Sequence, residues 1–343
     1  MLPILSSLLL STMALASSPR VLVYTRTAGY RHDSIPTAIQ ALGDHQQEYN
    51  VTFVFTEDQN MFTTDKLSGF DGVMFVSTTD EVLDDRGKAA LATYFQSGGV
   101  YTGVHAGSAC LFNDTNYQQA VGALFDYHPT LQNATFERLN STHPATAHLP
   151  DRWNLEDEVY NFRSDPRTNG AVVLLTVDES SYVLDGSSTG NYPPQGEPHP
   201  IAWYIESPLS AQPLRDGAPK PGRSFYTSLG HLSSTWLDDT FITHVMLGLR
   251  WALDGASTRA YGVGLVGNNS DTTSTTSSSA GPSSPGTATT HSPSSTGSGA
   301  TLPASASASG ASGAAGRARA VPGGVVGAAA VIGGAAAASL ALL

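Results

Sequence analysis

Short apolar runs and amphipathic stretches alternate along the first part of the folded region. After the first run, apolar residues recur at helical spacing at Ile35, Ala38, Ile39 and Leu42, and a second amphipathic stretch follows Asp84, a helix-capping residue. Strands that alternate with helices predict an α/β fold, with a doubly wound, mostly parallel sheet and helices on both faces. The apolar runs expected to form strands cover residues 21–24, 51–55, 70–76 and 99–104.

Two uncharged apolar segments lie at the ends of the chain. Residues 1–16 end in Ala14-Leu15-Ala16, a small-x-small cleavage pattern, and predict a secretory signal peptide. Residues 321–343 are long enough to span a bilayer, but a retained helix would leave Arg317 and Arg319 outside, against the positive-inside tendency. We therefore expect residues 313–343 to be a GPI-anchor signal that is removed on maturation. A single-pass helix and a merely low-complexity end are the alternatives.

Composition divides the chain near residue 255. Residues 256–343 hold four of the 46 charged residues and one of the 29 aromatic residues, too few to build a core. We expect one α/β domain over residues 19–255 and a disordered stalk, rich in Ser, Thr, Gly and Pro, over residues 256–312. The net charge is −12, and the first 255 residues carry −14 because the tail has three positive groups and one negative. Nucleic acid is therefore not expected as a partner, and no protein partner is predicted.

The sequons agree with a secretory route, and the cysteine content limits the possible cross-links. Cys110 is the only cysteine, which excludes an intramolecular disulfide, and we expect it to be a small buried residue rather than a nucleophile. The predicted location is the cell surface, with a lipid anchor joining the protein to the plasma membrane or cell wall. Glycosylation is expected at five Asn-x-Ser/Thr sites, namely Asn50, Asn113, Asn133, Asn140 and Asn268.

Candidate chemistry lies where the predicted strands end, because ligands of parallel sheets bind beyond the carboxyl ends of the strands. After the run 99–104, Gly103-Val104-His105-Ala106-Gly107 has the glycine spacing of a nucleophile elbow. The presented side chain is His105, which can act as an acid, a base or a metal ligand, but is not the nucleophile of a hydrolase. Arg31 and His32 follow the first run, and His231 follows a predicted strand over 224–229.

The second half of the chain adds polar groups that could meet His105. Glu158 and Tyr160 alternate along an extended run, which points both to one face, and a carboxylate beside a phenol suits the hydroxyls of a sugar. The adjacent Glu156 and Asp157 are interpreted as a solvated acidic turn. Trp236, in a loop before an amphipathic helix over 241–253, is either a sugar-stacking aromatic or a core residue.

The histidines leave the cofactor open. No pair of them has a zinc spacing such as His-x-x-x-His, so a divalent-metal site would have to be assembled from distant segments. His128 and His199, both near predicted strand ends, are the metal candidates. Cap, turn or packing roles are expected for His45, His143, His148 and His244.

An ordered series of motifs resembles the ThuA-like family. The resemblance covers about residues 20–255 and implies a class I glutamine-amidotransferase-like (flavodoxin-like) fold without the usual catalytic cysteine, consistent with His105 at the elbow. The family is linked to the utilisation of trehalose and related sugars, and some members to 3-keto-sugar derivatives. The signal peptide, stalk and anchor are departures from it. The motifs are GYRHDSI, GGVYTGVHAGSACLFN, His128-Pro129, His143-Pro144, LEDEVY, HPIAW and GRSFYTSLGH, followed by Phe241, His244, Gly248 and Trp251.

Two function hypotheses follow. The first is a cell-surface lyase, isomerase or hydrolase that acts on a carbohydrate or 3-keto-sugar derivative, with His105 and Glu158 as acid/base partners. His32 and His231 would be ligands or electrophilic donors in that enzyme. The second is a carbohydrate-binding or wall-associated protein that keeps the pocket without turnover. The residues expected to bind the substrate are Tyr160, Trp236, His199 and Arg31.

Overall fold

The computed structural model describes residues 18–268. The predicted signal peptide, most of the predicted stalk and the predicted anchor signal lie outside these residues. Within residues 18–268, no helix combines the length and the apolar character needed to cross a membrane. The strands are β1 (Arg20–Tyr24), β2 (Thr52–Thr56), β3 (Gly72–Val76), β4 (Val100–Val104), β5 (Phe125–Tyr127), β6 (Gln132–Arg138), β7 (Arg152–Asp157), β8 (Asn161–Phe162), β9 (Val172–Val177), β10 (Ala202–Ile205) and β11 (Ser224–Thr227). The helices are α1 (Ile35–His45), α2 (Thr64–Ser68), α3 (Asp85–Gln96), α4 (Thr115–Val121), α5 (Pro144–Ala147), α6 (Ser233–Trp236), α7 (Asp239–Asp254) and α8 (Ser257–Tyr261).

A nine-stranded sheet runs through the domain in the order β2-β1-β3-β4-β11-β10-β9-β6-β7. The first five strands in this order pair in parallel, which is the arrangement of a flavodoxin-like sheet. The remaining strands, β10, β9, β6 and β7, extend the sheet in antiparallel pairs. The predicted α/β fold with a mostly parallel sheet is confirmed, and the antiparallel extension is an addition that the apolar pattern did not indicate.

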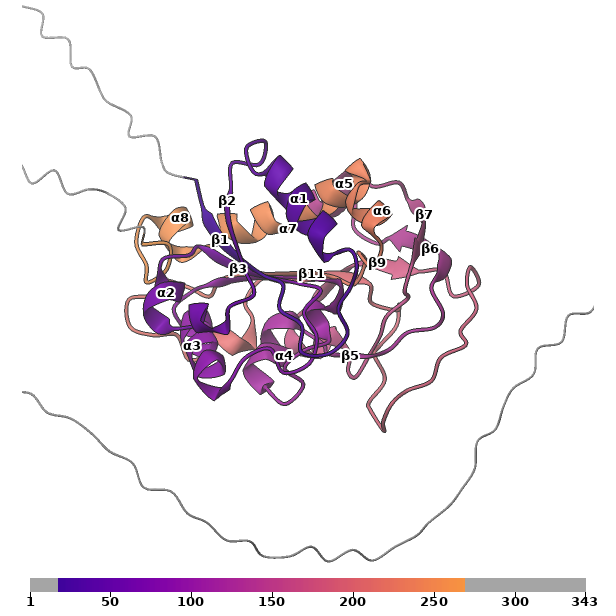
Figure 1. Cartoon of the computed structure of the whole chain (residues 1–343), viewed down its shortest axis with the longest axis horizontal. Coiled ribbons are helices and arrows are strands. Elements are labelled where there is room, and N and C mark those ends of the chain that lie inside the picture. The colour runs from indigo at the N-terminus through magenta and orange to yellow at the C-terminus, as the bar shows by residue number, and fades with distance from the viewer. Residues whose placement is uncertain (1–17, 269–343) are drawn as a thin grey trace, which may run out of the picture. The chain divides into compact units, whose positions relative to one another are not determined.

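Both faces of the parallel strands are buried, so their residues alternate between two cores. In β1, Val21 and Val23 belong to the core that contains α1 and α7, whereas Leu22 and Tyr24 belong to the core on the side of α2, α3 and α4. Figure 1 shows these two sets of helices on opposite faces of the sheet. Burying each such side chain contributes roughly 1.5–3 kcal/mol. This two-sided burial explains why the strands read as continuous apolar runs rather than alternating ones.

The folded part extends beyond residue 255. Val266 is 1 % exposed and packs in the core beside α2 and α3. Arg259 Nε of α8 donates to Asp71 Oδ1 at 2.9 Å. The predicted start of the stalk at residue 256 is therefore too early, because a few contacts with residues far away in the sequence hold this segment, and composition does not report them.

Candidate functional site

The turn after β4 has the tight geometry that its glycine spacing predicts. His105 has a φ of 54°, in the left-handed region that residues with a side chain rarely adopt. A Cβ on Gly103 would lie 2.5 Å from Tyr101 Oη, and one on Gly107 would lie 2.8 Å from the carbonyl oxygen of Phe75. Only glycine fits on either side of the turn. The turn places the His105 side chain, which is fully buried, above the carboxyl end of the central strands.

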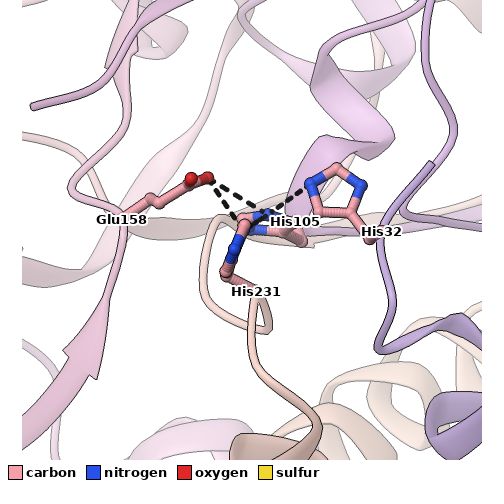
Figure 2. Close-up of side chains that lie close together, drawn as sticks. All are labelled: His32, His105, Glu158 and His231. Carbon is pink, nitrogen blue, oxygen red and sulfur yellow. Dashed lines mark hydrogen bonds and ion pairs between the residues drawn. The ribbon is translucent and has the colours of Figure 1, made fainter. Parts of the chain in front are cut away.

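Three other polar side chains converge on His105 from distant parts of the chain (Figure 2). His32 comes from the loop after β1, Glu158 follows β7, and His231 follows β11. His105 Nε2 lies 3.1 Å from His32 Nε2 and 3.3 Å from His231 Nδ1. Glu158 Oε2 lies 3.1 Å from His231 Nδ1 and 3.5 Å from His105 Nε2. All four residues proposed from sequence as catalytic therefore meet at one place.

The hydrogen bonds of His105 fix its neutral tautomer. Its Nδ1 lies 2.7 Å from the carbonyl oxygen of Ser228, which can only accept, so Nδ1 carries the proton and Nε2 has a free lone pair. The Tyr160 hydroxyl, 3.0 Å away, can donate to that Nε2. Burial lowers the pKa of His105 well below its usual range, and burial also lowers the pKa of His32 to about 4. Both imidazoles are therefore neutral at pH 7.

His231 differs from the other two histidines in its charge balance. Burial lowers its pKa, but the hydrogen bond from His231 to Glu158 and the negative charge of that carboxylate outweigh burial, so the net shift of the pKa is upward. The shared proton links His231 to Glu158.

Asp157 joins the segment that carries Glu158 to the loop that carries His231. Its carboxylate is fully buried and accepts hydrogen bonds from the backbone N–H of Gly230 at 2.8 Å, Glu158 at 2.8 Å and His231 at 3.3 Å. Burial raises the pKa of Asp157 to about 7. The prediction of a solvated turn is wrong for Asp157, because the end of β7 meets the loop after β11, whereas Glu156 is exposed as predicted.

A cavity of about 360 Å³ opens above the cluster, within the size range of small-molecule sites (roughly 300–1,000 Å³). His105 lies beneath it and does not line it, whereas the other three members of the cluster do. The exposed ring of Tyr30 stands edge-on to His32, with ring centroids 4.8 Å apart, and Phe125 packs against Tyr160 at 4.4 Å. The walls are formed by Tyr30, His32, Thr79, Ala106, Ala109, Phe125, His128, Glu158, Tyr160 and His231.

Comparison with known proteins identifies the family of this chain. The sequence model of the family described as ThuA, trehalose utilisation, matches residues 20–252. The chain belongs to the ThuA family. A comparison with curated proteins found no match.

Two solved structures of proteins described as ThuA-like share the fold. One, from Bacteroides uniformis ATCC 8492, has a TM-score of 0.55 and 19% identity, over 71% of this chain and 95% of that protein. The other, from Parabacteroides merdae ATCC 43184, has a TM-score of 0.51 and 17% identity, over 70% of this chain and 92% of that protein. The resemblance to the ThuA family that the motifs indicated is thereby confirmed.

The ThuA domain places the remaining predicted site residues in different surroundings. Tyr160 lines the cavity, and His128 Nε2 lies 3.3 Å from Glu158 Oε1 at its wall. His199 lies behind the wall, where Nδ1 contacts Glu179 at 2.6 Å and Nε2 donates to the carbonyl oxygen of Tyr160 at 2.8 Å. His199 therefore supports Tyr160. It is placed neither to bind a ligand in the cavity nor to join the cluster of His32, Glu158 and His231 around His105.

Two predicted substrate-binding residues of the ThuA domain lie away from the cavity. Trp236 is 1 % exposed, packs against Phe241 and donates its Nε1–H to the carbonyl oxygen of Gly230, so it is the core residue of the two alternatives. Arg31 pairs with Glu57 at 2.7 Å, and both side chains are about half exposed to solvent. A stacking role for Trp236 and a binding role for Arg31 do not fit these positions.

Besides the small Ala106 and Ala109, sequence reasoning missed three residues of the cavity wall. Tyr30 precedes His32 in the loop after β1, Thr79 follows β3, and Phe125 begins β5. The first two follow strands of the parallel sheet, so the rule that ligands bind beyond carboxyl ends could have indicated them. Phe125 carries no such signal, because β5 lies in a separate two-stranded sheet with β8.

Proposed function

We propose that this ThuA-family protein binds a carbohydrate or 3-keto-sugar derivative in the cavity and acts on it by acid–base chemistry. One observation carries the proposal: Glu158, flanked by His128 and His231, lies in the wall of a cavity with aromatic sides. The family description, trehalose utilisation, supports a sugar as the ligand class. Aromatic faces and hydrogen-bonding groups together suit a ring that carries hydroxyls.

Glu158 is the group best placed to move a proton. Glu158 is 7 % exposed, with Oε1 toward His128 and Oε2 toward His231. A carboxylate in this position can take a proton from the carbon beside a sugar ketone and return it after rearrangement. The enediolate oxygen formed in this step would be stabilised by hydrogen-bond donors in the same wall.

His105 takes a different part from the one its sequence position suggests. Because its side chain is fully buried beneath the cavity and does not line it, His105 is not placed to contact a ligand there. Its Nε2 instead lies within hydrogen-bonding distance of both the Tyr160 hydroxyl and His32 Nε2, and so helps to position these two side chains. In this proposal His105 is a positioning residue, and Glu158 is the catalytic one.

The test compares turnover and binding in the same protein. The purified full chain is assayed against 3-keto-glycosides and plain disaccharides, and sugar binding is measured by calorimetry. We expect turnover that falls by at least about 100-fold in Glu158→Gln, the size of a general acid–base contribution. His148→Gln, a substitution of an exposed histidine, is the matched control and should leave turnover unchanged. Sugar binding without any turnover would instead support the non-catalytic binding protein.

We also propose that the domain is secreted and held at the cell surface by a GPI anchor. The support is the sequence pattern at both ends, since residues 1–17 and 269–343 lie outside the described residues. Four of the five predicted glycosylation sites, Asn50, Asn113, Asn133 and Asn268, are exposed, and Asn140 is partly exposed. Phosphatidylinositol-specific phospholipase should release the protein from intact cells. Retention after this treatment would favour a transmembrane helix instead.

A further inference from the structure

We propose that His32, His105, Glu158 and His231 form a mononuclear divalent-metal site of the zinc type, with one side of the metal facing the cavity. Sequence spacing did not indicate this set, and it replaces His128 and His199 as the candidate ligands. The inference rests on the proposed function only for the sugar that would reach the metal. Metal binding itself can be tested without any substrate.

The distances within the cluster fit a single ion. A tetrahedral zinc site with metal–nitrogen bonds of about 2.0–2.1 Å has ligand atoms about 3.3–3.4 Å apart. Four of the ligand-atom pairs here lie 3.1–3.5 Å apart, and all of them lie within 4.8 Å. The cluster therefore already has the dimensions of a metal site, and His32 would need only a small adjustment.

The lone pairs in the cluster exceed the protons available to them. His105 Nε2 has one free lone pair, yet His32 Nε2, His231 Nδ1 and the Tyr160 hydroxyl all lie within 3.3 Å of it. Only one proton can point at that lone pair, so at least two of these contacts are unsatisfied in the metal-free protein. A cation at the centre would accept a lone pair from each of the three imidazoles and from Glu158 at once.

The groups around the cluster have the hydrogen bonds expected behind metal ligands. His105 donates its Nδ1–H to the carbonyl oxygen of Ser228, which fixes Nε2 as the ligand atom. The second oxygen of Glu158 lies 3.3 Å from His128 Nε2. Asp157 holds the backbone of both Glu158 and His231. The three nitrogen ligands and one carboxylate are a donor set that suits Zn²⁺, and also Ni²⁺ or Co²⁺.

The open side of the site faces the ligand cavity. His32, Glu158 and His231 line the cavity, whereas His105 closes the cluster from below. A metal held by these four would therefore face the cavity, where a carbonyl or hydroxyl oxygen of a sugar could add as a fifth ligand. With Glu158 Oε2 on the metal, Oε1 and His128 would remain in the wall to handle a proton.

The experiment measures metal directly. The purified full chain is stripped with a chelator, and Zn²⁺, Ni²⁺, Co²⁺ and Mn²⁺ binding is then measured by calorimetry and by elemental analysis after desalting. We expect about one equivalent of Zn²⁺ per chain. His231→Gln and Glu158→Gln should each weaken the affinity by at least about 100-fold, since even partners behind the ligands are worth 10–100-fold. The Co²⁺-loaded protein should show intense visible absorption of a four-coordinate site, which is lost in His231→Gln.

Matched variants keep the outcome interpretable. His148→Gln removes an exposed histidine outside the cluster and should bind metal like the wild type. His105→Ala is less suitable as the only variant, because His105 is buried at a strained turn and the substitution could prevent folding. Circular dichroism must first show that each variant is folded. No bound metal in the wild type, or metal retained in both His231→Gln and Glu158→Gln, overturns the proposal. Metal binding without sugar turnover would contradict only the proposed function. Turnover by the chelator-treated protein would contradict only a role of the metal in that turnover.

Discussion

Two regions of this ThuA domain bury histidines among aromatic rings, but the ring nitrogens have different partners in the two regions. One is the cluster beneath the cavity, with His32 and His105, and the other is the contact between α5 and α7, with His143 and His244. All four side chains are at most 6 % exposed. Burial lowers the pKa of His32, His143 and His244 alike, in each case to about 4. Neither burial nor a shifted pKa therefore separates a candidate site from packing.

The partners of the ring nitrogens separate the two regions. In the α5–α7 contact, both histidines bind the backbone of Ala145: its N–H donates to His143 Nδ1 at 3.2 Å, and its carbonyl oxygen accepts from His244 Nδ1 at 2.7 Å. His143 also stacks on Tyr204. Among residues 18–268, three or more metal-type ligands converge only in the cavity cluster. Several histidine and carboxylate ligand atoms that converge at strand ends indicate a candidate site. A histidine whose ring makes one hydrogen bond to the backbone indicates a packing role.

The largest expected effect tests whether a buried aromatic residue beside α7 contributes to stability and not to sugar binding. Trp236→Ala removes a buried indole beside α7 and should lower the free energy of unfolding by about 3–5 kcal/mol, measured by urea denaturation. The sugar affinity of the folded protein should not change. Leu237→Ala, at the next and 71 % exposed position, is the matched control and should stay within about 0.5 kcal/mol of the wild type. A sugar affinity that falls with Trp236→Ala would return this residue to the site.

A second test uses the pH dependence of stability. Burial lowers the pKa of His244 from 6.5 to about 4, so between these values the unfolded chain binds a proton that the folded chain does not. Stability is therefore complete above pH 6.5 and is lost as the pH falls toward 4, by about 3 kcal/mol for this histidine. His244→Leu should flatten the curve of unfolding free energy against pH in this window. The control His148→Gln should keep the wild-type slope, and an unchanged slope in His244→Leu would contradict a neutral buried His244.

Much of the parallel half of the fold was predictable from sequence, because its signals are local. The strand over 70–76 and the helix capped by Asp84 appear close to their expected bounds, and Asp84 accepts from the N–H of Gly87 as a cap should. The turn at His105 was predictable for the same reason. Gly103 and Gly107 are needed because a Cβ at either position would clash with neighbouring strands, which any such sheet supplies. Local patterns of this kind report what one segment needs.

The rest of the site depends on which distant segments meet. Asp157 was interpreted as solvated because nothing near it in the sequence shows that the end of β7 lies against Gly230. Trp236 was a candidate for stacking on the sugar and Tyr30 was not, for the same reason: Trp236 is covered by α7, whereas Tyr30 is 64 % exposed and lines the cavity. Exposure of an aromatic ring is a property of the tertiary fold, which spacing does not encode.

The smallest expected effect tests whether that exposed ring contacts the ligand. Tyr30→Ala should weaken sugar binding about five- to ten-fold, the value of roughly 1 kcal/mol that an aromatic contact contributes beyond its area. Because Tyr30 is largely exposed, the free energy of unfolding should stay near the wild-type value, unlike the loss in Trp236→Ala. Tyr30→Phe keeps the ring and should bind like the wild type, which separates stacking from hydrogen bonding. If Tyr30→Ala leaves the affinity unchanged, while Phe125→Ala reduces it, the ligand contacts the wall at Phe125 rather than the exposed ring of Tyr30.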